Sequence, residues 1–292
     1  MTRLSKNAAT TGKSFNAEVW GRFCRNRRAL VAMILLSIIL LAAIFADVIV
    51  DYDVCIQQNI AERLQAPSKE HILGTDRYGR DVFARIIHGS RASLSIGLVS
   101  TISSMLVACL LGSCAGYFGG KIEMLIMRVI DVLMCIPSIL LTLCLVAILG
   151  GSTTNLIIAL TIGLTPTFTR VVRSVVINLK GSDYIEAARA AGSSDFRIIA
   201  SHILPNAIGP IIVQASMNVS NAILQAASFS FIGLGVRPPA PEWGVMLSDA
   251  KDYMSMMPSL AIFPGLAIAI TALCFNLMGD GLRDALDPKL KD

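Results

Sequence analysis

The stretch that decides the fold runs from Ala92 to Gly120 and reads ASLSIGLVSTISSMLVACLLGSCAGYFGG. It contains no charged residue, and it is longer than the roughly 20 largely apolar residues that a helix needs to cross a bilayer. It also contains Gly112 and Gly116, whose spacing lets a second helix approach closely. The sequence therefore predicts a membrane-spanning helix that packs tightly against a neighbour.

Long uncharged stretches recur along the rest of the chain. The stretch 132–169 is too long for one crossing and contains the turn-forming residues Gly150 to Asn155, so it predicts two helices. Together these stretches predict an all-α membrane protein with six membrane-spanning helices. The expected spans are residues 29–50, 92–120, 124–149, 155–177, 203–236 and 253–279.

The composition agrees with a membrane protein. Of the 292 residues, 54% are hydrophobic and only 15% are charged, whereas a soluble domain has about 25% charged residues. This excludes a disordered chain, a collagen-like chain, a disulfide scaffold and a nucleic-acid-binding protein. The seven cysteines are scattered singly and show no metal-binding spacing. Contact with anionic lipid is enough to explain the net charge of +5.

The positions of Lys and Arg predict the orientation. With the N-terminus inside, 17 of the 25 basic residues lie in inner segments, so both termini are expected in the cytoplasm. The first span is too long for a cleaved signal peptide and is interpreted as an anchor. The expected regions are a basic N-terminus (1–28), the first span (29–50), an extracytoplasmic segment (51–89), a five-helix core (90–281) with a cytoplasmic loop (178–205), and a cytoplasmic tail (282–292).

The loop 178–205 is predicted to form a compact cytoplasmic knob. Asp183 is expected to cap a short helix with Glu186 as its reciprocal partner. Alanines continue this helix, and Gly192 is expected to end it in a left-handed conformation. A second short helix, 196–203, is expected to stop before Pro205, which begins the next span.

The alanines give the knob a flat surface suited to docking into a groove on a partner, although a solvated loop helix is the simpler interpretation. The candidate docking residues are Asp183, Glu186, Ala187, Ala188, Ala191 and Gly192.

The extracytoplasmic segment contains a glycine-rich run, Gly74-x4-Gly79-Arg80-Asp81. It lacks the Lys and the Ser or Thr that a phosphate-binding loop requires, so no nucleotide site is expected in this chain. Two further interpretations concern single side chains. Arg128 and Asp131 are expected to form an ion pair on one helix face, and Trp243 is expected to lie at a membrane interface.

Several motifs resemble those of ATP-binding-cassette importer permeases. Glu186-Ala187-Ala188-x3-Gly192, followed by His202-Ile203-Leu204-Pro205, resembles the EAA loop of that family, with His202 where the family has Ile. Other motifs resemble the dipeptide, oligopeptide and nickel subfamily, and in particular the second permease subunit of dipeptide systems. They are Leu73-Gly74-Thr75-Asp76-x2-Gly79-Arg80-Asp81-x3-Arg85, Gly116-Tyr117-Phe118-Gly119-Gly120, Met127-Arg128-x2-Asp131, Phe231-Ile232-Gly233-Leu234-Gly235, Pro241-Glu242-Trp243-Gly244 and Phe275 to Asp284.

The resemblance implies a type I importer permease in a bacterial inner membrane that forms half of a translocation pathway. It implies a second, homologous permease subunit, two cytoplasmic ATPase subunits that bind ATP and Mg²⁺, and an extracytoplasmic substrate-binding protein. No catalytic residue, metal or cofactor is expected in this chain. The implied substrates are dipeptides or short oligopeptides, with nickel or a metal chelate as the alternative.

An ion-coupled secondary transporter is the alternative from a different class. Such a protein would place acidic or His residues inside the membrane for coupling. The central stretches of the second, fourth, fifth and sixth spans contain none, which argues against it.

Overall fold

The computed structural model describes residues 15–286, with side chains from Val19 onward. In order, its helical elements are α1 (Phe15–Arg25), α2 (Arg27–Ile44), α3 (Ala46–Ile49), α4 (Tyr52–Ile56), η1 (Ile60–Glu62), α5 (Val82–Phe118), α6 (Gly120–Met134), α7 (Ser138–Leu149), α8 (Thr153–Lys180), α9 (Asp183–Ala190), α10 (Asp195–Arg197), η2 (Ile198–Ile203), α11 (Leu204–Phe231), α12 (Trp243–Ala250), η3 (Lys251–Tyr253) and α13 (Ser259–Leu286). Within residues 15–286, five helices are long and apolar enough to cross a membrane, and the bent pair α6–α7 makes six if it counts as one span. The chain is therefore an all-helical, multi-pass membrane protein.

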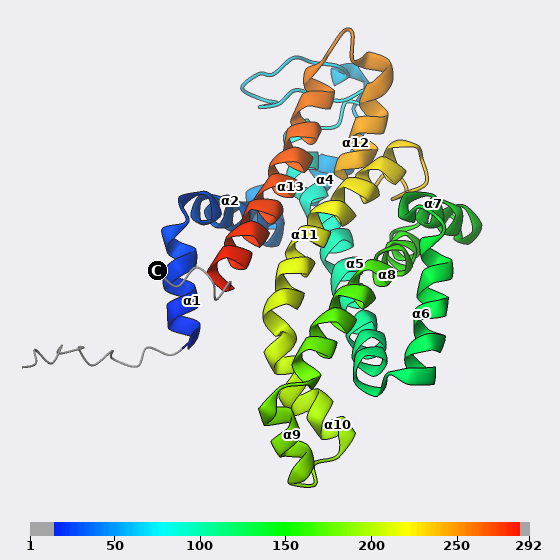
Figure 1. The fold of residues 1–292 in the computed structure, drawn as a ribbon. Coiled ribbons are helices and arrows are strands. Elements are labelled where there is room, and N and C mark those ends of the chain that lie inside the picture. The colour runs from blue at the N-terminus through cyan, green and yellow to red at the C-terminus, as the bar shows by residue number, and fades with distance from the viewer. Residues whose placement is uncertain (1–14, 287–292) are drawn as a thin grey trace, which may run out of the picture.

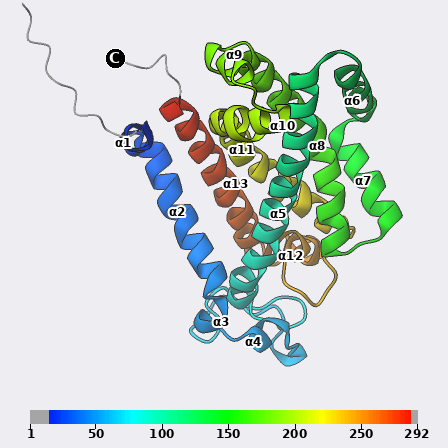
Figure 2. The same cartoon turned by 90° about the horizontal axis from the view of Figure 1, so that it is seen from below.

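The long helices form a bundle that carries different short helices at its two ends (Figure 1). α9 and α10 project from one end, called the knob end below. α4 and α12 lie at the other end, called the clamp end. α2 lies at one side of the bundle against α13, and α6 and α7 lie at the opposite side (Figure 2).

α5 and α8 approach each other closely at two glycines of α5. A Cβ atom on Gly112 would lie 2.7 Å from Cβ of Val172, and one on Gly116 would lie 3.0 Å from Cβ of Val176. Any larger residue at Gly112 would push the two helices apart. The predicted close approach at this pair of glycines is confirmed.

The second span begins earlier than the sequence predicted. α5 begins at Val82, ten residues before the uncharged stretch, because Asp81 caps it by accepting a hydrogen bond of 2.8 Å from the backbone N–H of Ala84. Polar side chains in its first turns bond to the chain between α2 and α4. His88 Nε2 lies 2.8 Å from the carbonyl oxygen of Val50, and Arg91 donates to the carbonyl oxygen of Ile44 and to Asp47, each at 2.8 Å.

The prediction of one continuous helix over 124–149 is wrong. α6 and α7 meet at an angle of 83°, with the break between Met134 and Ser138. Pro137 explains the break, because it has no N–H to donate and it disfavours a helical conformation at Ile136. The N–H of Cys135 is the last to bond inside α6, to the carbonyl oxygen of Asp131 at 3.0 Å.

The expectation that Trp243 lies at a membrane interface is also wrong. Its side chain is 2% exposed, and its indole N–H donates to the carbonyl oxygen of Ile86 at 3.0 Å. Glu242 begins α12 just before it, and its buried carboxylate accepts bonds of 2.9 Å from the N–H groups of Gly244 and Val245. Trp243 therefore fixes α12 onto α5 rather than anchoring the chain in lipid.

Candidate functional site

The knob consists of residues 181–203 and begins with α9. Ser182 is the N-cap: its backbone is extended, and its carbonyl oxygen accepts from the N–H groups of Ile185 and Glu186 at 2.9 and 3.2 Å. Asp183 is therefore the first residue of the helix, and the prediction that it caps the helix with Glu186 as reciprocal partner is wrong. Both carboxylates still lie in the first turn, where they interact favourably with the helix dipole.

The end of α9 matches the prediction for Gly192. This residue has φ +80°, in the left-handed region that glycine adopts without steric cost. Its N–H donates to the carbonyl oxygen of Arg189 at 3.0 Å, and the N–H of Ser193 donates to that of Ala188 at 3.1 Å. This bond pair is the Schellman motif, which turns the chain sharply at a fixed angle.

Apolar side chains attach the knob to the bundle. Ile185, Ile198 and Ile203 are completely buried, in one cluster with Val176 of α8 and Tyr117 of α5. Tyr117 also donates from its hydroxyl to Asp195 at 2.6 Å, which holds the start of α10 against the end of α5. Because α9 contributes Ile185 and η2 contributes Ile198 and Ile203 to this cluster, the knob is fixed as a unit to α5 and α8.

The second helix of the knob continues into the next span. α10 leads into η2, a six-residue π-helical segment, and η2 leads directly into α11. The prediction that the short helix stops before Pro205 is wrong. The N–H of Leu204 donates to the carbonyl oxygen of Ile199 across the junction, and Pro205 lies in the first turn of α11, inside this continuous helical segment. The knob and α11 are therefore joined without an intervening loop.

The predicted docking residues lie together on the knob. Ala188 is half-buried against the apolar cluster. The others are exposed, namely Asp183, Glu186, Ala187, Ala191 and Gly192.

Sequence reasoning missed Phe196, whose side chain is 81% exposed, and Tyr184, which is 42% exposed. Aromatic side chains exposed beside small residues are typical anchors of protein interfaces. The signal for Phe196 was an apolar residue directly after a helix start, in a segment otherwise rich in polar and small residues.

At the clamp end, charged residues form a largely buried network, called the charge clamp below. Its members are Asp76, Arg77 and Arg80 from the segment leading into α5, Arg85 from the start of α5, and Asp249 from α12. Arg80 is 1% exposed and donates to Asp76 at 2.7 Å and to Asp249 at 2.8 Å. Arg77 donates to the other oxygen of Asp249 at 2.8 Å. The charge clamp therefore ties residues 76–85 to α12.

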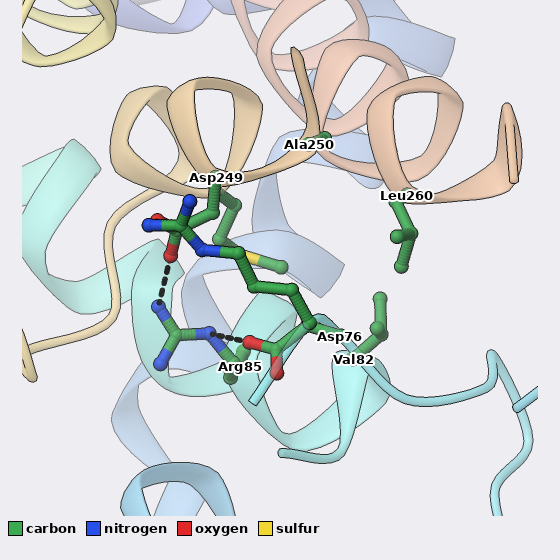
Figure 3. Close-up of a pocket in the computed structure, with 8 residues that line it drawn as sticks. Asp76, Val82, Arg85, Asp249, Ala250 and Leu260 are labelled. Carbon is green, nitrogen blue, oxygen red and sulfur yellow. Dashed lines mark hydrogen bonds and ion pairs between the residues drawn. The ribbon is translucent and has the colours of Figure 1, made fainter. Parts of the chain in front are cut away.

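Arg85 lies between the two carboxylates of the charge clamp (Figure 3). It is 1% exposed, with Nε 3.6 Å from Asp76 and Nη2 4.0 Å from Asp249. Nη2 has no hydrogen-bond partner within the described residues, and the cavity beside it has a volume of about 10 Å³. That is room for about one water molecule, which would satisfy the donor.

Two further ion pairs join α6 to α8. Arg170 donates to Asp131 at 2.6 Å, and Arg173 donates to Glu123. The predicted pair of Arg128 with Asp131 is therefore wrong, because the carboxylate of Asp131 bonds across to α8. Within residues 15–286, no group of three or more His, Cys, Asp or Glu side chains is placed to hold a metal ion.

Two family models match the chain. Residues 108–292 match the binding-protein-dependent transport system inner membrane component, and residues 14–67 match the N-terminal TM domain of oligopeptide transport permease C. The first match includes the whole knob, and the second includes α1 and α2.

Similar proteins include two curated permeases. The dipeptide transport system permease protein DppC of Alkalihalophilus pseudofirmus is 46% identical, over 94% of this chain and 90% of the relative. The glutathione transport system permease protein GsiD of Pectobacterium atrosepticum is 44% identical, over 94% of this chain and 91% of the relative. A solved structure of the MetNI methionine ABC transporter in an inward-facing conformation aligns with a TM-score of 0.58 and 19% identity, over 70% of this chain and 98% of the solved one. That structure has the same fold.

Proposed function

The chain belongs to the family of binding-protein-dependent transport system inner membrane components, and from that premise we propose that it imports dipeptides or short oligopeptides as one permease subunit of an ATP-driven transporter. The observation that carries the substrate class is the 46% identity to a dipeptide permease over 94% of the chain. The 44% identity to a glutathione permease also supports a peptide substrate, because glutathione is a short peptide.

The proposal includes an orientation and a set of partners. The knob end faces the cytoplasm of a bacterial cell and the clamp end faces outward across the inner membrane, as the distribution of Lys and Arg indicates. A second, homologous permease completes the pathway. Two ATPase subunits bind ATP and Mg²⁺ below the membrane, and a binding protein delivers substrate above it. This chain forms one half of the translocation pathway and contributes no catalytic group.

The knob is proposed as the coupling element. Ala187, Ala191 and Gly192 present a small, exposed surface that fits a cleft on an ATPase subunit, and Asp183 and Glu186 add negative charge beside it. The buried contacts of Ile185 and Ile198 make the knob rigid with respect to α5 and α8. Closure of the two ATPase subunits would therefore tilt these helices and, through η2, also α11.

Uptake into proteoliposomes tests the proposal. The chain, its second permease and the ATPase subunits are reconstituted together, and the binding protein and radiolabelled dialanine are added outside. ATP enclosed in the vesicles is expected to drive accumulation, and omission of the ATPase subunits is expected to abolish it. Uptake driven by an ion gradient without ATPase subunits would contradict the proposal and favour a secondary transporter. Uptake of nickel or a metal chelate but of no peptide would contradict the substrate class.

A further inference from the structure

Most membrane-spanning helices of this chain present apolar exposed faces. Ile38 of α2, Leu106 of α5 and Leu266 of α13 are 57%, 58% and 50% exposed. The exposed serines Ser37 and Ser95 donate to carbonyl oxygens of their own helices, at 2.7 and 2.9 Å. Faces of this kind are compatible with lipid, because every polar group is satisfied inside the helix.

α11 differs from these helices. Gln214, Asn221, Gln225 and Ser228 recur at intervals of seven, four and three residues, which places them along one face of the helix. Asn221 and Ser228 are exposed, and Gln214 and Gln225 are half-buried. The row is about 20 Å long at the helical rise, and we call it the amide stripe.

The amides distinguish this stripe, because Ser228 donates to the carbonyl oxygen of Leu224 at 2.8 Å and is satisfied inside the helix. Within the described residues, no hydrogen bond satisfies the side chain of Asn221 or Gln225, and Gln214 reaches only Asn218, at 3.5 Å. Asn218 borders the stripe, is 5% exposed, and has an Nδ2 without a partner. A side-chain amide left unsatisfied in lipid is strongly unfavourable, so this face needs water or a polar partner.

The composition of the two faces of α11 argues against simple helix packing at the stripe. Close helix–helix contacts in membranes use small residues, and those of α11, such as Ala222 and Ala226, lie on its buried face. The stripe carries longer side chains, and the exposed Leu224 borders it.

We propose that the amide stripe of α11 lines the translocation pathway and hydrogen-bonds the main chain of the passing peptide. Each amide both donates and accepts, which matches the N–H and C=O of a peptide unit whatever the peptide's side chains. The stripe carries no charge, so it holds the substrate without trapping either terminus. The inference rests on the proposed function and deepens it by naming residues of the substrate path.

Cysteine labelling in the assembled complex tests this inference. Asn221→Cys and Gln225→Cys are made in a cysteine-free background, with Leu266→Cys and Leu273→Cys on the apolar face of α13 as matched controls. A charged, membrane-impermeant methanethiosulfonate is applied during ATP turnover. The two stripe positions are expected to react about ten-fold faster or more than the controls, because a thiol ionises in water and not in lipid. Saturating dialanine is expected to slow the reaction at both stripe positions.

Transport by conservative variants gives a second readout. Asn221→Leu is expected to reduce dialanine uptake about five-fold, the effect of one lost hydrogen bond, whereas Asn221→Gln retains uptake. If the complex without these substitutions imports dialanine but the cysteines at positions 221 and 225 stay unlabelled in the variants, the inference is overturned and the proposed function stands. Unchanged uptake by Asn221→Leu also overturns the inference. If the unsubstituted complex imports no dialanine, the proposed function is overturned, whatever the result of the labelling experiment.

Discussion

The knob and the charge clamp lie at opposite ends of the bundle and are held in different ways. The knob is attached by buried isoleucines and one tyrosine hydrogen bond, and it leaves its alanines and Phe196 exposed. The charge clamp consists of ion pairs, and its central pairs, Arg80 with Asp76 and Asp249, are almost completely buried. The knob therefore presents an exposed surface, whereas the charge clamp holds residues 76–85 against α12.

This difference separates two mechanical roles. Apolar contacts bury the knob's inner face without requiring a particular chemistry of its outer face, which stays available to a partner. Buried ion pairs are specific in geometry, so they fix residues 76–85 onto α12 in a single arrangement. We therefore expect damage at the charge clamp to unfold the clamp end, and damage at the knob to impair coupling first.

The largest effect on stability is expected from Asp249→Ala. This change leaves Arg77 and Arg80 without their shared partner, and removing one member of a buried ion pair costs about 3–5 kcal/mol. The unfolding temperature of the purified protein in detergent measures this loss of stability. Asp252→Ala is the matched control, because Asp252 lies three residues away and is exposed. An unfolding temperature equal to that of the control would show that the charge clamp does not stabilise this end.

A somewhat smaller effect is expected from Ile185→Ala in the knob. The side chain is completely buried, and truncating a buried isoleucine costs about 2–5 kcal/mol. We expect the loss to be local, so that amide hydrogen exchange speeds up in α9 and not in α12. Ile177→Ala, at a 42% exposed position of α8, serves as the control. Uniformly faster exchange in both regions would contradict an independent attachment of the knob.

A third, smaller effect is expected at Gly192. No atom lies within 4 Å of the position where a Cβ would be, so backbone strain alone opposes a side chain at φ +80°. Gly192→Ala is expected to lose about 1–2 kcal/mol, and Gly192→Asn less, because asparagine tolerates this conformation. Gly181, which also has open space but a negative φ, is the control site. Hydrogen exchange of α9 measures all three variants, and equal rates for Gly192→Ala and Gly181→Ala would contradict the prediction.

The smallest effect concerns Cys55 beside the charge clamp. Burial raises the pKa of this thiol from 9.0 to about 11, although Arg85 nearby opposes the shift. The thiol is therefore expected to stay protonated and unreactive toward a maleimide between pH 7 and pH 9. In the unfolded chain the thiol ionises near its ordinary pKa of 9.0. The free energy of unfolding is therefore expected to fall as the pH rises from 9 toward 11, because only the unfolded state loses the proton in that range. Mass spectrometry of labelled peptides measures the reaction, with the same thiol in the denaturant-unfolded chain as reference, and equal rates would contradict the prediction.

The sequence predicted the local features well. The uncharged stretches located the spans, and Gly112, Gly116 and Gly192 indicated the close helix contact and the end of α9. Each of these features depends on residues close together in the chain or on conformations that glycine alone adopts readily.

Features that depend on distant residues could not be predicted. Arg80 and Asp249 are 169 positions apart, and only the fold brings them together. The partner of Asp131 was missed for the same reason, since Arg170 on another helix is closer than Arg128 on its own. Pro137 indicated a kink, but its angle of 83° could not be read from the sequence, and in the fold α7 packs against α8. The N-cap was misplaced by one residue because Ser182 and Asp183 can both cap a helix.

The central claim is that the knob couples ATPase closure to the membrane-spanning helices, and Ala187→Trp tests it most directly. Ala187 is exposed, so a tryptophan there leaves the fold intact while it fills the proposed docking surface. Ala269→Trp on the exposed face of α13 is the matched control. ATP-driven dialanine uptake by the reconstituted complex is expected to be abolished in the first variant and retained in the second, with equal amounts of both inserted. Normal uptake by Ala187→Trp would contradict the account.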